Sequence, residues 1–168
     1  MGVWKAWPGA SDLQKQRARA RLAATHLLTA MGIPMLWMGK EVGRVHYGNH
    51  PPSGSGVDAS NNAFNWNEYL AVAENMALKA YYAGLIALRL DHPNLRVAQA
   101  DPAGSGAWSW NMTDGAASLW GSGVLAWVSK GSGDNAFAVF LNFSATDRTW
   151  NASFPADGNW KLVTDSNP

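Results

Sequence analysis

The stretch Met31–His50, MGIPMLWMGKEVGRVHYGNH, decides the fold that we expect for this chain. Gly32 and Pro34 end the helical pattern before them, and a short apolar run, Ile33–Met38, follows. Because this run is apolar at successive positions, it predicts a strand buried on both faces, as in parallel sheets covered by helices. A buried strand whose carboxyl end displays polar side chains is a common basis for a functional site in α/β folds. The polar side chains after it are Lys40, Glu41, Arg44, His46, Tyr47, Asn49 and His50.

Two helical patterns flank this stretch. Ser11–Gln14 matches a capping box, and apolar residues at helical spacing continue to about Met31. The second pattern runs from about residue 67 to Asp91, and its wide apolar surface predicts burial against more than one neighbour. It ends before Pro93 because the residue that precedes a proline avoids the α region. The sequence therefore predicts a helix–strand–helix unit whose strand has no partner of its own.

From Leu95 onward the pattern changes to a period of two, which is typical of strands. A Gly-rich segment, Lys130–Asn135, predicts a hairpin loop between two of them. Short strands at regular spacing favour an antiparallel β-sandwich. The predicted strands are Leu95–Gln99, Ala107–Met112, Gly123–Ser129, Ala136–Phe143, Thr149–Phe154 and Trp160–Val163.

The expected fold class is therefore α+β, with two long helices and one orphan strand of the barrel type, followed by an antiparallel β-sandwich. Residues 1–10 show no periodicity and are expected to form a loosely docked leader. Residues 11–93 hold the helix–strand–helix unit, which looks like the last quarter of a βα barrel. Residues 94–168 hold the sandwich, which ends one or two strands early.

Composition excludes several functional classes. The net charge of the 168-residue chain is +1, so a nucleic-acid partner recognised through a basic face is not expected. Cysteine is absent, which rules out disulfides and thiolate metal sites. No apolar run reaches the roughly 18 residues of a transmembrane helix, so no membrane partner is expected. The N-terminus has no secretory pattern, and we expect a protein of the bacterial cytoplasm.

Tryptophan is unusually frequent, with ten residues in the chain. Its large ring packs well in the core of a sandwich. An exposed Trp ring also covers the C–H face of a sugar, so a binding platform is the alternative interpretation.

Several segments resemble glycoside hydrolase family 13, the α-amylase superfamily. GIPMLWMGKEVGR, residues 32–44, resembles the family's last barrel strand and the loop after it. GNH at 48–50 and NAFNW at 62–66 resemble a loop of pullulanase- and isoamylase-type debranching enzymes. YYAGLIALRLDHPNLR, residues 81–96, resembles their next helix. FAVFLNFSA at 137–145 and SFPADGNWKLVTDS at 153–166 resemble strands of the C-terminal β-domain.

The resemblance implies the last helix–strand–helix of a (β/α)8 barrel plus most of the C-terminal sandwich, and an α-glucan such as starch or pullulan as partner. No cofactor is implied. The family's nucleophile Asp, acid/base Glu and stabilising Asp all precede this segment, so none of them lies in this chain. Pro51-Pro52-Ser53 also departs from the Asn-Ser-Tyr that debranching enzymes carry after the loop histidine.

Glycoside hydrolysis needs two carboxyl groups, about 5 Å apart for retention and farther apart for inversion. Near the loop, Glu41 and Asp58 are weak catalytic candidates: the resemblance implies a mostly structural role for Glu41, and Asp58 is most simply a turn residue. His46 and His50 are four residues apart, but the intervening Gly48 argues against a helix, so no metal site is predicted. The expected substrate-binding residues are Arg44, His46, Tyr47, Asn49, His50 and Trp66.

Three functions stay open: a protein that hydrolyses α-glucans, a non-catalytic carbohydrate-binding module, and a self-associating structural fragment without activity. Under all three we expect a homo-oligomer formed by strand or helix exchange. The reason is that an orphan strand and wide apolar helix faces seldom stay exposed to water.

Overall fold

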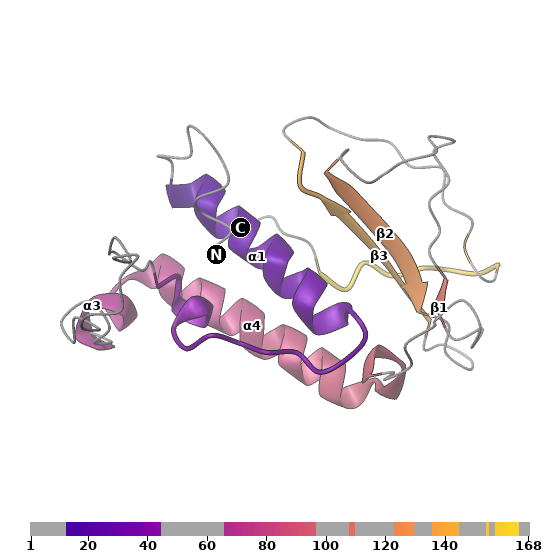
Figure 1. Ribbon diagram of the computed structural model, residues 1–168, viewed down its shortest axis with the longest axis horizontal. Helices are drawn as coiled ribbons and strands as arrows, with labels where there is room; N and C mark the ends of the chain where they lie inside the picture. Colours follow the sequence, from indigo (N-terminus) through magenta and orange to yellow (C-terminus); the bar gives the residue numbers. More distant parts are fainter. Residues whose placement is uncertain are drawn as a thin grey trace, which may run out of the picture.

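The computed structural model describes residues 13–44, 66–96, 108–109, 123–129, 136–144, 154 and 157–164. Two long helices lie side by side, and a small sheet lies against one end of the pair (Figure 1). In chain order, the described elements are helix α1 (Leu13–Thr29), the 3-10 turn η2 (Lys40–Val42), helices α3 (Trp66–Leu70) and α4 (Ala73–Asp91), the 3-10 turn η3 (Pro93–Arg96) and strands β1 (Trp108–Ser109), β2 (Val124–Ser129) and β3 (Phe137–Asn142).

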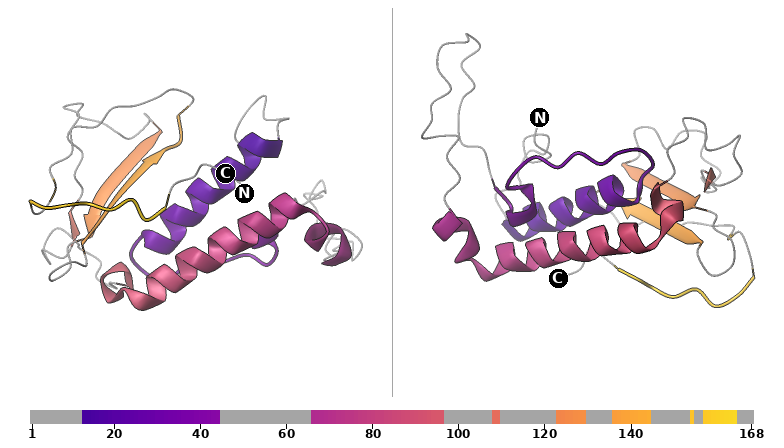
Figure 2. Two further views of the ribbon diagram at one scale, coloured as in Figure 1. Left: turned by 180° about the vertical axis from the view of Figure 1, so that it is seen from behind. Right: turned by 90° about the horizontal axis from the view of Figure 1, so that it is seen from below.

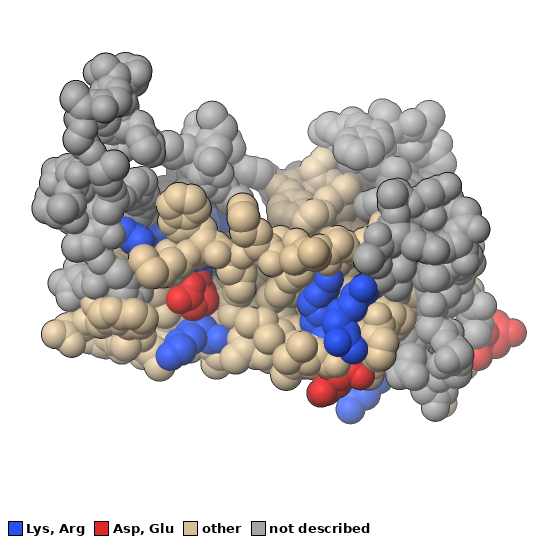
Figure 3. All heavy atoms as spheres, turned by 60° about the horizontal axis from the view of Figure 1, so that its bottom comes forward, with Lys and Arg blue, Asp and Glu red and all other residues tan. Residues whose placement is uncertain are grey.

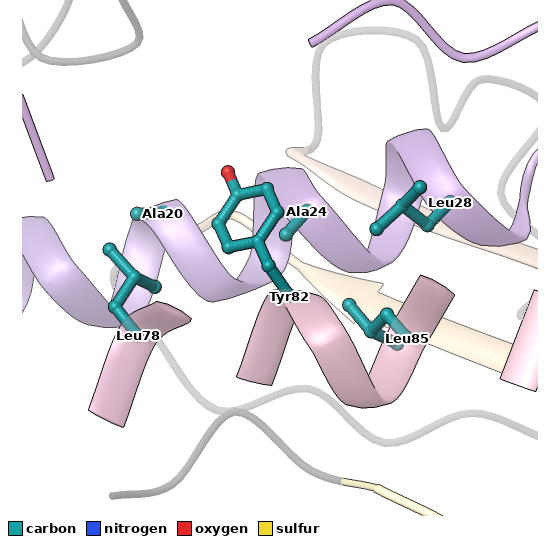
Figure 4. Close-up of a cluster of buried hydrophobic side chains, with 6 residues drawn as sticks. All are labelled: Ala20, Ala24, Leu28, Leu78, Tyr82 and Leu85. Carbon is teal, nitrogen blue, oxygen red and sulfur yellow. The ribbon is translucent and has the colours of Figure 1, made fainter. Parts of the chain in front are cut away.

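Helices α1 and α4 run in the same direction and share one core. Cross-helix contacts advance together along both helices, from Arg17 with Asn75 to the carbonyl of Leu28 with Arg89. The small side chains of α1 leave room for the Tyr82 ring (Figure 4). Burying each large apolar side chain of this cluster contributes roughly 1.5–3 kcal/mol. The cluster consists of Ala20, Ala24 and Leu28 from α1 and Leu78, Tyr82 and Leu85 from α4.

The second predicted helix is interrupted. It forms α3 and α4, with the extended residue Val72 between them as the N-cap of α4. The Asn75 side chain stabilises this break, because its Nδ2 donates a hydrogen bond to the carbonyl of Tyr69 at 3.1 Å. The end of α4 is as predicted: His92 is extended, and the helix stops before Pro93.

The prediction of a buried strand at Ile33–Met38 is wrong for the described structure. Residues 33–37 are in no strand, and the Ile33 and Trp37 side chains are 96% and 68% exposed. The segment returns from the end of α1 to the start of the second helical region across one face of the helix pair (Figure 2). A strand is buried on both faces only when it has strand neighbours and helices on both sides. The described residues supply helices on one side and no neighbouring strand.

The sheet confirms two of the six predicted strands. Strands β1, β2 and β3 pair antiparallel in that order, and Trp127 lies directly opposite Val139. Residues 160–163 form no strand and are exposed, which corrects the last predicted strand. Leu95 is buried in η3 instead of opening a strand. Of the second predicted strand, only residues 108–109 are described, and they form β1. The remaining predicted strand residues that lie outside the described residues are 97–99 and 149–153.

One face of the sheet packs on the helices. The Trp127 ring meets the His26 ring edge-on at 5.6 Å, and Ser129 Oγ donates to the carbonyl of Asn94 at 2.9 Å. These residues alternate along β2 and so share a face. The intervening residues of β2, Val124, Ala126 and Val128, are also buried, so this strand is covered on both faces.

Candidate functional site

The polar loop after the extended segment begins as a tight turn. Gly39 and Gly43 flank η2 with φ values of 90° and 72°, in the left-handed region that glycine adopts at little cost. The backbone N–H of Arg44 donates to the carbonyl of Gly39 at 2.8 Å and closes the turn. Val42 is buried, and a Cβ on Gly43 would lie 3.7 Å from Leu78. The turn is therefore packed onto the first half of α4.

This turn brings two of the predicted site residues together. Glu41 is half-buried beside Tyr82; burial and the Glu41 charge raise the pKa of the Tyr82 phenol. The phenol therefore keeps its proton. Burial and the nearby Arg44 guanidinium lower the pKa of Lys40. The turn thus gathers one carboxylate, one ammonium and one guanidinium at the edge of the helix pair.

Several polar groups near this turn hold the elements in place. Arg17 Nη2 donates to Asn75 Oδ1 at 3.2 Å and so links the first turns of α1 to α4. Arg44 is only 7% exposed, which favours an anchoring role within the fold. Its role in substrate binding stays a prediction.

The other predicted site residues are only partly placed. Trp66 opens α3, and its side chain is 58% exposed. His46, Tyr47, Asn49, His50 and Asp58 lie outside the described residues, so the separation of Glu41 and Asp58 is untested.

Sequence reasoning missed the role of Arg89 and of the hydroxyl groups on the facing sides of the two helices. Arg89 is buried and binds carbonyl groups at the end of α1. Thr25 and Thr29 lie one helical turn apart, and Tyr81 faces Thr25 at 2.7 Å. The four-residue spacing of the two threonines is visible in the sequence, whereas nothing in the sequence distinguishes Tyr81 from the rest of the wide apolar surface of its helix.

Charge and composition of the described surface limit the site chemistry. In Figure 3, Lys and Arg atoms occur in small separate groups among Asp and Glu atoms on the face shown. No group of three His, Asp or Glu side chains suited to a metal ion occurs in the part of the chain that the structure describes. None of the described helices combines the length and apolar character needed to cross a bilayer.

Comparison with known proteins supports a relationship to the debranching type of glycoside hydrolase family 13. The chain is 29% identical over 177 residues to a protein of Flavobacterium sp named isoamylase. The match covers 95% of this chain and 22% of the relative, so the chain spans about a fifth of the relative's length. No family model matches the chain.

Proposed function

We propose that this chain is the C-terminal part of a debranching-type, α-glucan-active protein and that it contributes sugar contacts. The observation that carries the proposal is the similarity to isoamylase across 95% of the chain. Hydrolysis requires two carboxyl groups at the glycosidic bond. Since the catalytic carboxylates of the family that the chain resembles precede the matching segment, we assign binding to this chain. We assign hydrolysis to a longer polypeptide, one that also contains the part of the relative that this chain does not match.

The geometry of the helix pair supports the barrel part of this proposal. Helices α1 and α4 are parallel, and the segment between them runs back across one face of the pair (Figure 2). This is the arrangement of a helix–strand–helix unit in a βα barrel. We propose that Ile33–Met38 becomes a strand when neighbouring strands are present. Burial of β2 on both faces supports a sandwich in residues 94–168.

The loop after this segment and the first residue of α3 would contact the sugar in two ways. Trp66 offers an exposed ring to the C–H face of a glucose unit, and Glu41 accepts hydrogen bonds from hydroxyl groups. We also assign hydrogen-bond donors, acceptors and an aromatic ring for the sugar to four further loop residues: His46, Tyr47, Asn49 and His50.

We expect the chain to be retarded during electrophoresis in gels that contain amylopectin. Removing an aromatic platform costs about 1 kcal/mol, so Trp66→Ala should weaken retardation several-fold. Glu41→Gln should weaken it less, because the amide still accepts hydrogen bonds. Leu90→Ala, an exposed apolar change on α4, is the matched control and should migrate like the unchanged chain. A chain that is not retarded at all would contradict the proposal.

A self-associating fragment is the second candidate, and the exposed apolar segment favours it. More than half of each of the side chains Ile33, Met35, Trp37 and Met38 is exposed, and such apolar patches seldom stay in water. We expect light scattering to give the mass of a dimer or larger assembly. The double variant Met35→Ser, Trp37→Ser should shift the mass to the monomer, whereas Ile86→Ser on α4 should not. A monomeric unchanged chain would rule out this candidate.

A further inference from the structure

A groove of about 780 Å³ runs along the outer edge of β3. Strand β3 is an edge strand of the described sheet, because the strand order is β1-β2-β3. Helices α1 and α4 form one wall, and residues 157–164 form the other. The groove is lined neither by Glu41 and Arg44 of the turn nor by Trp66 of α3. It is therefore separate from the candidate site described above.

The hydroxyl groups of the helical wall present acceptors to the groove. Thr25 Oγ1 donates its one proton to the carbonyl of Arg21 at 2.9 Å. In the 2.7 Å contact between Thr25 and Tyr81, the Tyr81 hydroxyl must then be the donor. Thr29 Oγ1 likewise donates its proton to the carbonyl of Thr25 at 2.6 Å. Each of the three hydroxyl protons is already donated within the protein, so a ligand that bonds to these three oxygens must supply the hydrogen-bond donors.

The side of the groove away from the helices is aromatic. Phe140 lies opposite Ala126 and so projects from the sheet face that does not pack on the helices. Phe140 from β3 and Trp160 from the outer wall both line it. Phe154 connects them, with ring centroids 6.3 Å from Phe140 and 4.7 Å from Trp160. Aromatic faces together with a few placed polar groups are typical of sites for small organic ligands, which occupy roughly 300–1,000 Å³. Asp157 and Lys161 add charged groups to the lining.

We propose that this groove is a second binding site for a short α-glucan segment. A glucan has C–H faces that pack on aromatic rings, and its many hydroxyl groups donate to the committed oxygens of Thr25, Thr29 and Tyr81. The inference rests on the proposed function, because that function supplies α-glucan as the ligand class.

Calorimetric titration of the full chain with maltoheptaose tests the groove. We expect two molecules to bind per chain. Tyr81→Phe removes one acceptor and keeps the ring, and should weaken one of the two affinities several-fold. Trp160→Ala removes the aromatic wall and should abolish that same binding event. Trp66→Ala should affect the other event, and Leu90→Ala neither. Circular dichroism checks that each variant folds; Tyr81→Phe keeps the test valid should Trp160→Ala unfold.

The outcomes separate this inference from the proposed function. If no maltoheptaose binds to the unchanged chain, both are overturned. If one molecule binds, and Trp66→Ala removes it while Tyr81→Phe and Trp160→Ala leave it unchanged, the groove inference alone is overturned. If the groove variants remove the only binding event, the groove stands and the loop is no longer the proposed site.

Discussion

Replacing Arg89 by methionine is expected to lower the free energy of unfolding by about 3 kcal/mol or more. Arg89 Nη1 donates to the carbonyls of Leu28 and Ala30, each at 2.8 Å, and Nη2 donates to the carbonyl of Gly32 at 2.6 Å. Hydrogen bonds from a charged donor contribute about 1.5–3 kcal/mol each, and carbonyls left unpaired in a buried place add a desolvation cost. The guanidinium also faces the negative end of the α1 dipole. Methionine fills much of the space but satisfies none of these groups.

Equilibrium unfolding in urea measures this effect. Arg89→Lys is the informative second variant, because an ammonium group keeps the charge at the end of α1 but lacks the planar fork of donors. We expect it to fall between the unchanged chain and Arg89→Met. Arg96→Met is the matched control: Arg96 is exposed, and surface changes usually stay within about 0.5 kcal/mol. A loss of less than 1 kcal/mol for Arg89→Met would show that the three hydrogen bonds do not hold α1 in place.

Arg89 also fixes where the extended segment leaves α1. Gly32 has a φ of 87°, and its carbonyl is held by Arg89. Because the segment starts from this point and ends in the turn with Glu41, the position of the candidate loop depends on a residue of the second helix. The extended segment is thus held at its start by Arg89 and at its end by the packing of the turn on α4.

The sequence predicted the long helices well because their signals are local. Apolar spacing places α1 and α4, and the proline after His92 ends α4. The break at Val72 escaped prediction because an extended residue inside a helical pattern leaves the apolar spacing intact. The prediction of a strand at Ile33–Met38 was wrong for a different reason. Its apolar run carries the pattern of a strand inside a sheet, and the partners that would bury it are not among the described residues.

The candidate site was also predicted only in part, because local sequence signals place its turn but not the contacts of its side chains with distant residues. Gly39 and Gly43 flank a turn at the place where the sequence predicts a loop with polar side chains, and this turn carries Glu41. Arg44 follows it directly. That Arg44 would be buried was not visible, because burial of a charged side chain depends on contacts between distant parts of the chain. Arg89 was missed likewise: in the sequence, an arginine between Leu88 and Leu90 looks like a solvated position, and only the parallel docking of α1 gives it three carbonyl partners.

Replacing Trp127 by alanine should destabilise the chain by about 3–5 kcal/mol. The Trp127 side chain is 1% exposed, lies directly opposite Val139 and meets the His26 ring at 5.6 Å. It is the largest side chain of the cluster that joins the sheet to α1, and its loss leaves a cavity there. The cluster between α1 and α4 contains none of these residues. We therefore expect hydrogen exchange to accelerate most in β2 and β3, and less in the two helices.

His26 gives a second, site-specific measurement of the same change. Burial lowers the pKa of this histidine below its ordinary value, because the charged ring would lose contact with water. Removing the Trp127 ring admits water, so the pKa of His26 in the folded variant should rise toward the ordinary value in an NMR titration. Trp66→Ala, a substitution of an exposed tryptophan in α3, should leave both the exchange pattern and the His26 pKa unchanged. Equal acceleration of exchange in helices and sheet, with an unchanged His26 pKa, would mean that Trp127 supports the whole fold and not the contact between its two parts.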